Sequence, residues 1–115
     1  MAKVFTVCFH SEGDKIPKEM FEAIKEQVGS FEKTRKWFPK IKLKVRFKSQ
    51  FCYLDSIEEN NNISPLCRLR YFKNHGWSMA FYAWSIEKYT PCSFGSGDIG
   101  TIEDAIKACE FCYLN

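Results

Sequence analysis

The sequence has no hydrophobic run long enough to cross a membrane, because charged or polar residues interrupt its short apolar stretches. A transmembrane helix needs about 18 or more apolar residues in succession. The first residues, MAKVFTVCFHSEGDK, also lack the apolar segment of a secretory signal peptide. We therefore expect no membrane contact and a cytoplasmic chain.

Histidine is scarce, and the spacing of His10 and His75 places neither next to a nucleophile or a metal-ligating pair. Cys109 and Cys112 form a C-x-x-C pair, but redox motifs of this type stand at a helix N-terminus, and this pair falls late in an apolar stripe. We expect the six cysteines to be reduced and metal-free in a chain without an export signal. No residue is assigned a catalytic role, and no cofactor is expected.

Residues 95–100, GSGDIG, match the glycine pattern of phosphate-binding loops and precede a predicted helix. A dinucleotide-binding fold needs a parallel strand after that helix, and only fifteen residues follow Gly100. We interpret the segment as a turn that leads into a capped helix. A small-ligand site between this loop and the sheet is a weaker alternative.

Apolar residues are plentiful: the 115 residues are 45% hydrophobic and 17% aromatic, which predicts one globular domain spanning 1–115. Apolar side chains recur at helical spacing from Pro17, which suits a first helical turn, to a stop near Gly29. A second helix follows Thr101, which forms a capping-box pattern with Asp104. The apolar stripe of this second helix consists of Ile102, Ala105, Ile106, Cys109, Cys112 and Tyr113.

Strict alternation of apolar and basic residues predicts a strand over residues 41–48 that extends toward Leu54, followed by a polar loop over 55–65. Residues 66–72 and 77–86 predict two further strands around a turn at 74–76, and aromatic residues at both parities place the second inside the sheet. A short strand at 89–94 contains Pro91 and therefore belongs at an edge. Residues 4–9 are a possible extra strand.

These elements predict an α+β fold, in which an antiparallel meander of three to four strands carries an N-terminal and a C-terminal helix on one face. The order resembles that of the double-stranded RNA-binding domain, and Trp77 followed by GTIEDAIKA resembles the AP2-type DNA-binding domains. The first family has lysines where this chain has Glu103 and Asp104, and the second has arginines in strands where 77–86 has none. We therefore assign the chain to no family and carry no residues across.

Charge is strongly segregated: residues 33–48 hold eight cations and no acid, although the formal net charge of the chain is only +3. Alternate side chains of a strand lie about 6.6 Å apart on one face, so the basic residues of 41–48 form a row that a second strand can widen. The predicted row consists of Lys42, Lys44, Arg46 and Lys48 with Arg68 and Arg70. Such a row attracts nucleic acid or an acidic protein surface, and it equally serves as a solvated face or protects a strand edge.

Two functions therefore follow from the sequence. The first is a non-enzymatic module that contacts nucleic acid through the basic row, weakly and without sequence preference, with aromatic side chains available for stacking. The second is a homodimeric interaction protein whose interface uses the aromatic surplus of the later strands, Trp77, Tyr82 and Trp84.

Overall fold

The structure is a computed structural model that describes residues 13–94, 97–112 and 114. The possible strand at 4–9 lies outside these residues. A single 3₁₀ turn, η2 (Lys18–Met20), leads into helix α1 (Phe21–Glu32), and helix α2 (Ile102–Cys112) follows the strands. The five strands are β1 (Lys42–Lys48), β2 (Phe51–Ile57), β3 (Ile63–Phe72), β4 (Gly76–Ala83) and β5 (Lys88–Cys92).

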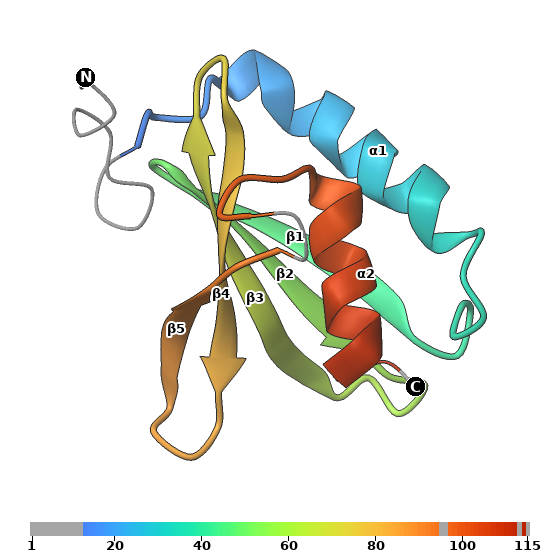
Figure 1. The fold of residues 1–115 in the computed structure, drawn as a ribbon. Helices are drawn as coiled ribbons and strands as arrows, with labels where there is room; N and C mark the ends of the chain where they lie inside the picture. Colours follow the sequence, from blue (N-terminus) through green and yellow to red (C-terminus); the bar gives the residue numbers. More distant parts are fainter. Residues whose placement is uncertain (1–12, 95–96, 113, 115) are drawn as a thin grey trace.

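The strands form one antiparallel meander in the order β1-β2-β3-β4-β5 (Figure 1). This confirms the predicted α+β class with one strand more than expected. β4 lies inside the sheet, and β5 with Pro91 lies at an edge, as predicted.

The additional strand comes from the segment that was predicted as the end of one strand and a polar loop. Ser49 adopts a left-handed backbone, with φ of 55°, so β1 ends at Lys48 and the chain reverses into β2. The predicted loop over 55–65 is also wrong, because Asp55 and Ser56 are buried in β2 and β3 already begins at Ile63. A charged residue is compatible with a buried strand position here because Arg46 on β1 neutralises Asp55.

Helix α1 does not end at Gly29 but continues to Glu32. Val28 is buried and Phe31 packs against the core, so apolar contacts hold the helix on both sides of the glycine. A glycine inside a helix costs only about 1 kcal/mol relative to alanine, which such packing outweighs.

The start of α2 forms the predicted capping box. The backbone N–H of Asp104 donates to Thr101 Oγ1 at 3.0 Å, and the backbone N–H of Thr101 donates to Asp104 Oδ2 at 3.1 Å. The preceding Gly100 exchanges two backbone hydrogen bonds with Trp77 on β4. A side chain at position 100 would lie within 3.0 Å of the Phe94 ring, so only glycine fits where this loop joins the sheet.

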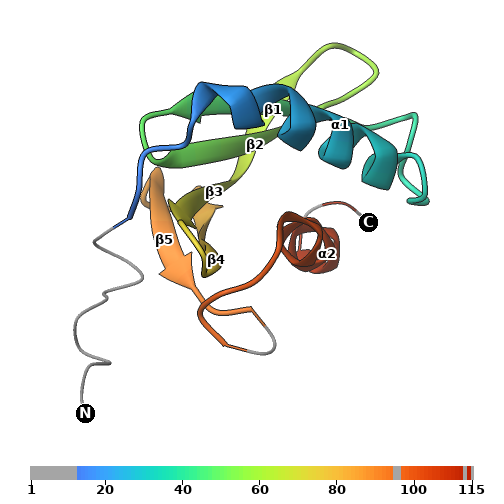
Figure 2. The same cartoon turned by 90° about the horizontal axis from the view of Figure 1, so that it is seen from above.

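Both helices pack on one face of the sheet. α1 runs along β1, while α2 packs against β3 and β4 and touches α1 (Figures 1 and 2). The core between the layers contains Leu54, Leu69 and Met79 from the strands and Ile24, Ile102 and Ile106 from the helices. None of the helices that the structure describes is long and apolar enough to cross a membrane.

Candidate functional site

The side of the sheet away from the helices carries the candidate site, and we call it the open face. Residues paired across neighbouring antiparallel strands share a face, so the register assigns each strand residue to one side. β1 shows this most clearly, since its basic residues are exposed while Leu43, Val45 and Phe47 pack against the core. The open face contains Lys42, Lys44, Arg46, Lys48, Phe51, Tyr53, Asp55, Ile57, Ile63, Pro65, Arg68, Arg70, Phe72, Gly76, Ser78, Ala80, Tyr82, Tyr89 and Pro91.

All six cations of the predicted row share this face. In the register, Arg46 lies opposite Tyr53, and Tyr53 lies opposite Arg68 on β3. The side chains of Lys42, Lys44 and Lys48 are exposed on β1, at one edge of the sheet. None of these three lysines forms an ion pair with another residue that the structure describes. Their charges are therefore available to a polyanion.

Arg46 differs from the three lysines of β1 because Asp55 neutralises its charge. Its Nε donates to Asp55 Oδ2 at 2.6 Å and its Nη2 donates to Asp55 Oδ1 at 3.1 Å. Only 5% of the Asp55 side chain is exposed, and its hydrogen bonding raises the pKa of Arg46 above the ordinary arginine value, although burial opposes the shift. Arg46 therefore holds the Asp55 carboxylate in place. The sequence did not indicate this ion pair, because Asp55 was predicted to lie in a loop.

Aromatic rings form a continuous row across the open face. Successive ring centroids lie 6.0, 5.5, 5.2 and 4.9 Å apart. We call this set the aromatic row, and in that order it consists of Phe51, Tyr53, Tyr89, Tyr82 and Trp84.

Arginine guanidinium groups lie over three rings of the aromatic row, those of Phe51, Tyr53 and Tyr89. Arg68 lies 4.5 Å and Arg70 lies 4.8 Å from the centre of the Phe51 ring, and Arg68 also lies 5.3 Å from that of Tyr89. Arg46 lies 4.6 Å from the centre of the Tyr53 ring. These cation–π contacts hold cations and rings in one layer, which keeps positive charge and stacking surface side by side.

The structure brings together two of the three predicted interface residues. Tyr82 and Trp84 are neighbours in the aromatic row, and Trp84 is 55% exposed. Trp77 does not join them, because it lies on the helix-covered face, packs against Tyr71 and is only 7% exposed. Alternate strand residues point to opposite faces, so the odd-numbered Trp77 is separated from the even-numbered pair.

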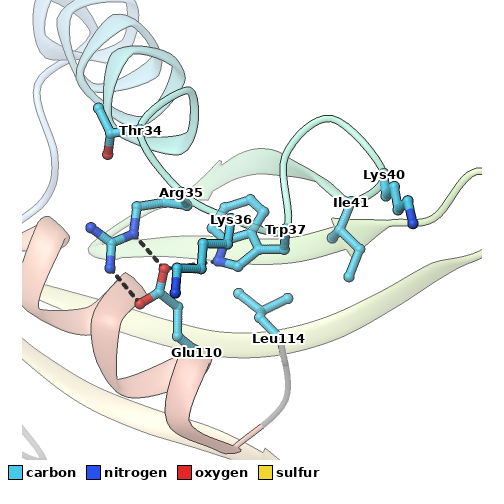
Figure 3. A pocket seen from close by; sticks show the side chains of 8 residues that line it. All are labelled: Thr34, Arg35, Lys36, Trp37, Lys40, Ile41, Glu110 and Leu114. Atoms are coloured by element: carbon cyan, nitrogen blue, oxygen red, sulfur yellow. Dashed lines mark hydrogen bonds and ion pairs between the residues drawn. The ribbon is translucent and has the colours of Figure 1, made fainter.

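A pocket of about 810 Å³ lies apart from the open face, between the loop that joins α1 to β1 and the C-terminal part of α2 (Figure 3). Its lining residues are Thr34, Arg35, Lys36, Trp37, Lys40, Ile41, Glu110 and Leu114. This is not the predicted ligand site at the glycine-rich loop, of which residues 95 and 96 lie outside the described part of the chain.

Glu110 organises this pocket by accepting hydrogen bonds from two residues of the loop. Arg35 donates through both Nε and Nη2, the latter to Oε1 at 2.7 Å, and Trp37 Nε1 donates to Oε2 at 2.8 Å. The hydrogen bond from Arg35 is the main reason that the pKa of Glu110 lies below its usual value, with a smaller contribution from Trp37. The cluster ties the loop to α2, and a separation of 75 residues leaves no signal for it in the sequence.

Cys52, Cys67, Cys92 and Cys109 are free thiols. Burial raises the pKa of the Cys52 thiol to about 12, and the pKa of Cys67 is also raised, mainly by a hydrogen bond with Cys109 and also by burial. Protonated, buried thiols are poor nucleophiles and poor metal ligands. Among the residues that the structure describes, no three cysteine, histidine or acidic side chains gather as a metal site would require.

Comparisons with protein-family models, curated proteins and solved structures found no match for this chain. The function is therefore argued from the geometry of the open face.

Proposed function

We propose that this protein is a non-enzymatic module that binds nucleic acid, weakly and with little sequence preference, through the open face. The observation that carries the proposal is that Lys42, Lys44 and Lys48, which form no ion pair with a described residue, share a sheet face that neither helix covers. Arg68 and Arg70 lie on the same face. The only acidic residue in the five strands, Asp55, is already paired, so it does not repel a polyanion.

The arrangement of these cations supports phosphate contacts rather than base recognition. The basic residues of β1 stand about 6.6 Å apart along the strand, and β3 adds cations about 10 Å away across the sheet. Such a surface can neutralise several phosphates but offers no element that enters a groove. Helix α2 is unsuitable for groove contacts, because Glu103, Asp104 and Glu110 place three carboxylates on it.

Replacement of Lys42, Lys44 and Lys48 with glutamine tests the proposal. Binding of a fluorescently labelled oligonucleotide at low salt should weaken strongly, and each lost lysine should lower the magnitude of the log-log salt slope by about 1. The parent protein, with about four or five phosphate contacts, should show a slope of about −4 on duplex DNA.

A second triple variant, Lys18→Gln/Lys25→Gln/Lys107→Gln, is the matched control. It removes the same charge from exposed positions on η2, α1 and α2, away from the open face. We expect it to bind nearly as well as the parent. Equal binding by the parent and the open-face variant, or equal losses in both variants, would contradict the proposal.

The second candidate function is self-association as a homodimer through Tyr82 and Trp84. The observation that favours it is the exposure of two large apolar side chains on the turn between β4 and β5, Trp84 at 55% and Ile86 at 57%. An apolar contact of this kind resists salt, whereas binding of a polyanion weakens steeply as salt rises. An acidic protein surface is a further partner that the same cations would attract.

A further inference from the structure

The aromatic row gives the open face a second property that phosphate binding does not require. Tyr53 lies on β2 and Tyr89 on β5, and two strands separate them. In a flat sheet the two backbones would be about 14 Å apart, yet the ring centroids are 5.5 Å apart. The register row of Tyr53 continues through Arg68 on β3 to Ala80 on β4, whose side chain is small. A ring surface therefore extends across the middle of the sheet.

The lysines and the rings occupy different zones of the open face. The three lysines without an ion pair stand on β1 at one edge of the sheet, and the aromatic row extends from β2 to the turn beyond β4. Arg68 and Arg70, on β3, lie within the zone of the rings, and their guanidinium groups lie over Phe51. A single nucleic-acid strand has the matching layout, with phosphates along one side and bases along the other.

A duplex does not match this layout, because its bases are stacked on one another and expose only their edges. Unpaired bases can stack on aromatic rings or on arginine planes. Trp84 is best placed for such contact, because the rings nearer β1 carry guanidinium groups, whereas Trp84 meets Tyr82 at an interplanar angle of 78° and is 55% exposed.

We infer that the ligand of the open face is single-stranded nucleic acid, held by its phosphates at the lysines of β1 and by a base stacked on Trp84. This inference rests on the proposed function and specifies its ligand. Trp84 adds affinity without adding a phosphate contact, so its contribution is independent of salt.

Trp84→Ala tests the inference, with Ile86→Ala as the matched control. Ile86 lies on the same turn and is equally exposed, but it has no ring to stack on a base. In fluorescence anisotropy with a labelled oligothymidylate of about twelve nucleotides, Trp84→Ala should weaken binding about 5-fold or more with an unchanged salt slope. Ile86→Ala should bind like the parent, and Trp84→Phe should retain most of the affinity because a ring is preserved.

The outcomes separate this inference from the function on which it rests. The inference is wrong if a duplex of equal length binds as tightly as the single strand, or if Trp84→Ala and Ile86→Ala bind alike. In either case, loss of binding in the variant with Lys42, Lys44 and Lys48 replaced still supports the proposed function. If the parent binds neither oligonucleotide at low salt, the proposed function is wrong and the inference falls with it.

Discussion

At the scale of single residues, the ion pair with Arg46 allows the carboxylate of Asp55 to be buried on the open face. The Asp55 side chain is nearly buried, whereas 44% of the Arg46 side chain is exposed. Removing the arginine leaves a buried carboxylate without its partner, which destabilises a protein much more than loss of a surface charge does. The substitution Arg46→Met keeps an unbranched apolar side chain at this position and removes the guanidinium group.

We expect Arg46→Met to lower the free energy of unfolding by about 1 to 3 kcal/mol, below the cost for a fully buried pair because water screens the exposed arginine. Lys44→Met, on the same strand and face, is the control and should change it by less than about 0.5 kcal/mol. Adding Asp55→Asn to Arg46→Met should recover part of the loss, since a neutral amide is easier to bury. Urea unfolding measures all three, and equal stability of the two single variants would contradict this role of Asp55.

The lowered pKa of Glu110 predicts that the stability of the fold depends on pH. Its pKa is lower in the folded protein than in the unfolded chain, mainly because of the hydrogen bond from Arg35. The resulting stability is fully present above the unfolded glutamate pKa of about 4.3 and is lost as the pH falls through the lower folded value. Glu110→Gln should therefore melt below the parent at pH 7, and the difference should narrow at pH 3. A difference in melting temperature that is unchanged or larger at pH 3 would show that this ion pair does not stabilise the fold.

At the scale of elements, the capping box determines where α2 begins. Thr101→Ala removes the hydroxyl that accepts the Asp104 backbone N–H, which should cost about 1 kcal/mol of stability. Lys107→Ala changes an exposed residue of the same helix and should be nearly neutral. Thermal unfolding of the two variants compares them directly. If both melt at the temperature of the parent, other contacts determine the start of the helix.

The elements that the sequence predicted well are those with a local signal. β1 alternates between basic and apolar residues without interruption, and its exposure alternates in the same way. Thr101 and Asp104 specify their own hydrogen bonds, because both partners of a capping box lie within four residues. Where the residue pattern and the hydrogen-bond partners lie within one short segment, the sequence is sufficient to predict the element.

The errors occur where a distant partner decides the local structure. Asp55 is in a strand because Arg46 neutralises it, and Glu110 gathers Arg35 and Trp37 from the other end of the chain. The periodicity of residues within one segment predicts neither the ion pair of Asp55 nor the hydrogen bonds of Glu110. The six cations of the site were predictable from alternation, whereas the aromatic row depends on which of several aromatic residues share a face, and this requires the register between strands.

At the scale of the whole molecule, the two candidate functions use the same surface. Tyr82 and Trp84 belong to the aromatic row and also to the proposed dimer contact. If the dimer forms, light scattering at high protein concentration should give twice the mass of the chain in both low and high salt, because apolar contacts are not screened. Single-stranded DNA should then dissociate the dimer by competing for the rings. A particle with the mass of one chain at high concentration would contradict the second candidate.

The central claim is that the open face, and not the pocket beside α2, is where nucleic acid binds. The three tryptophans provide the most direct test, because Trp84 lies on the open face, Trp77 is buried under the helices, and the indole N–H of Trp37 is hydrogen-bonded to Glu110 in the pocket. We propose a titration with oligothymidylate followed by the three indole N–H signals in a proton–nitrogen correlation spectrum. The account predicts that the Trp84 signal moves, together with backbone amides of β1 and β3, while those of Trp37 and Trp77 stay in place. Movement of the Trp37 signal with the amides of residues 33–40, and none at Trp84, would contradict it.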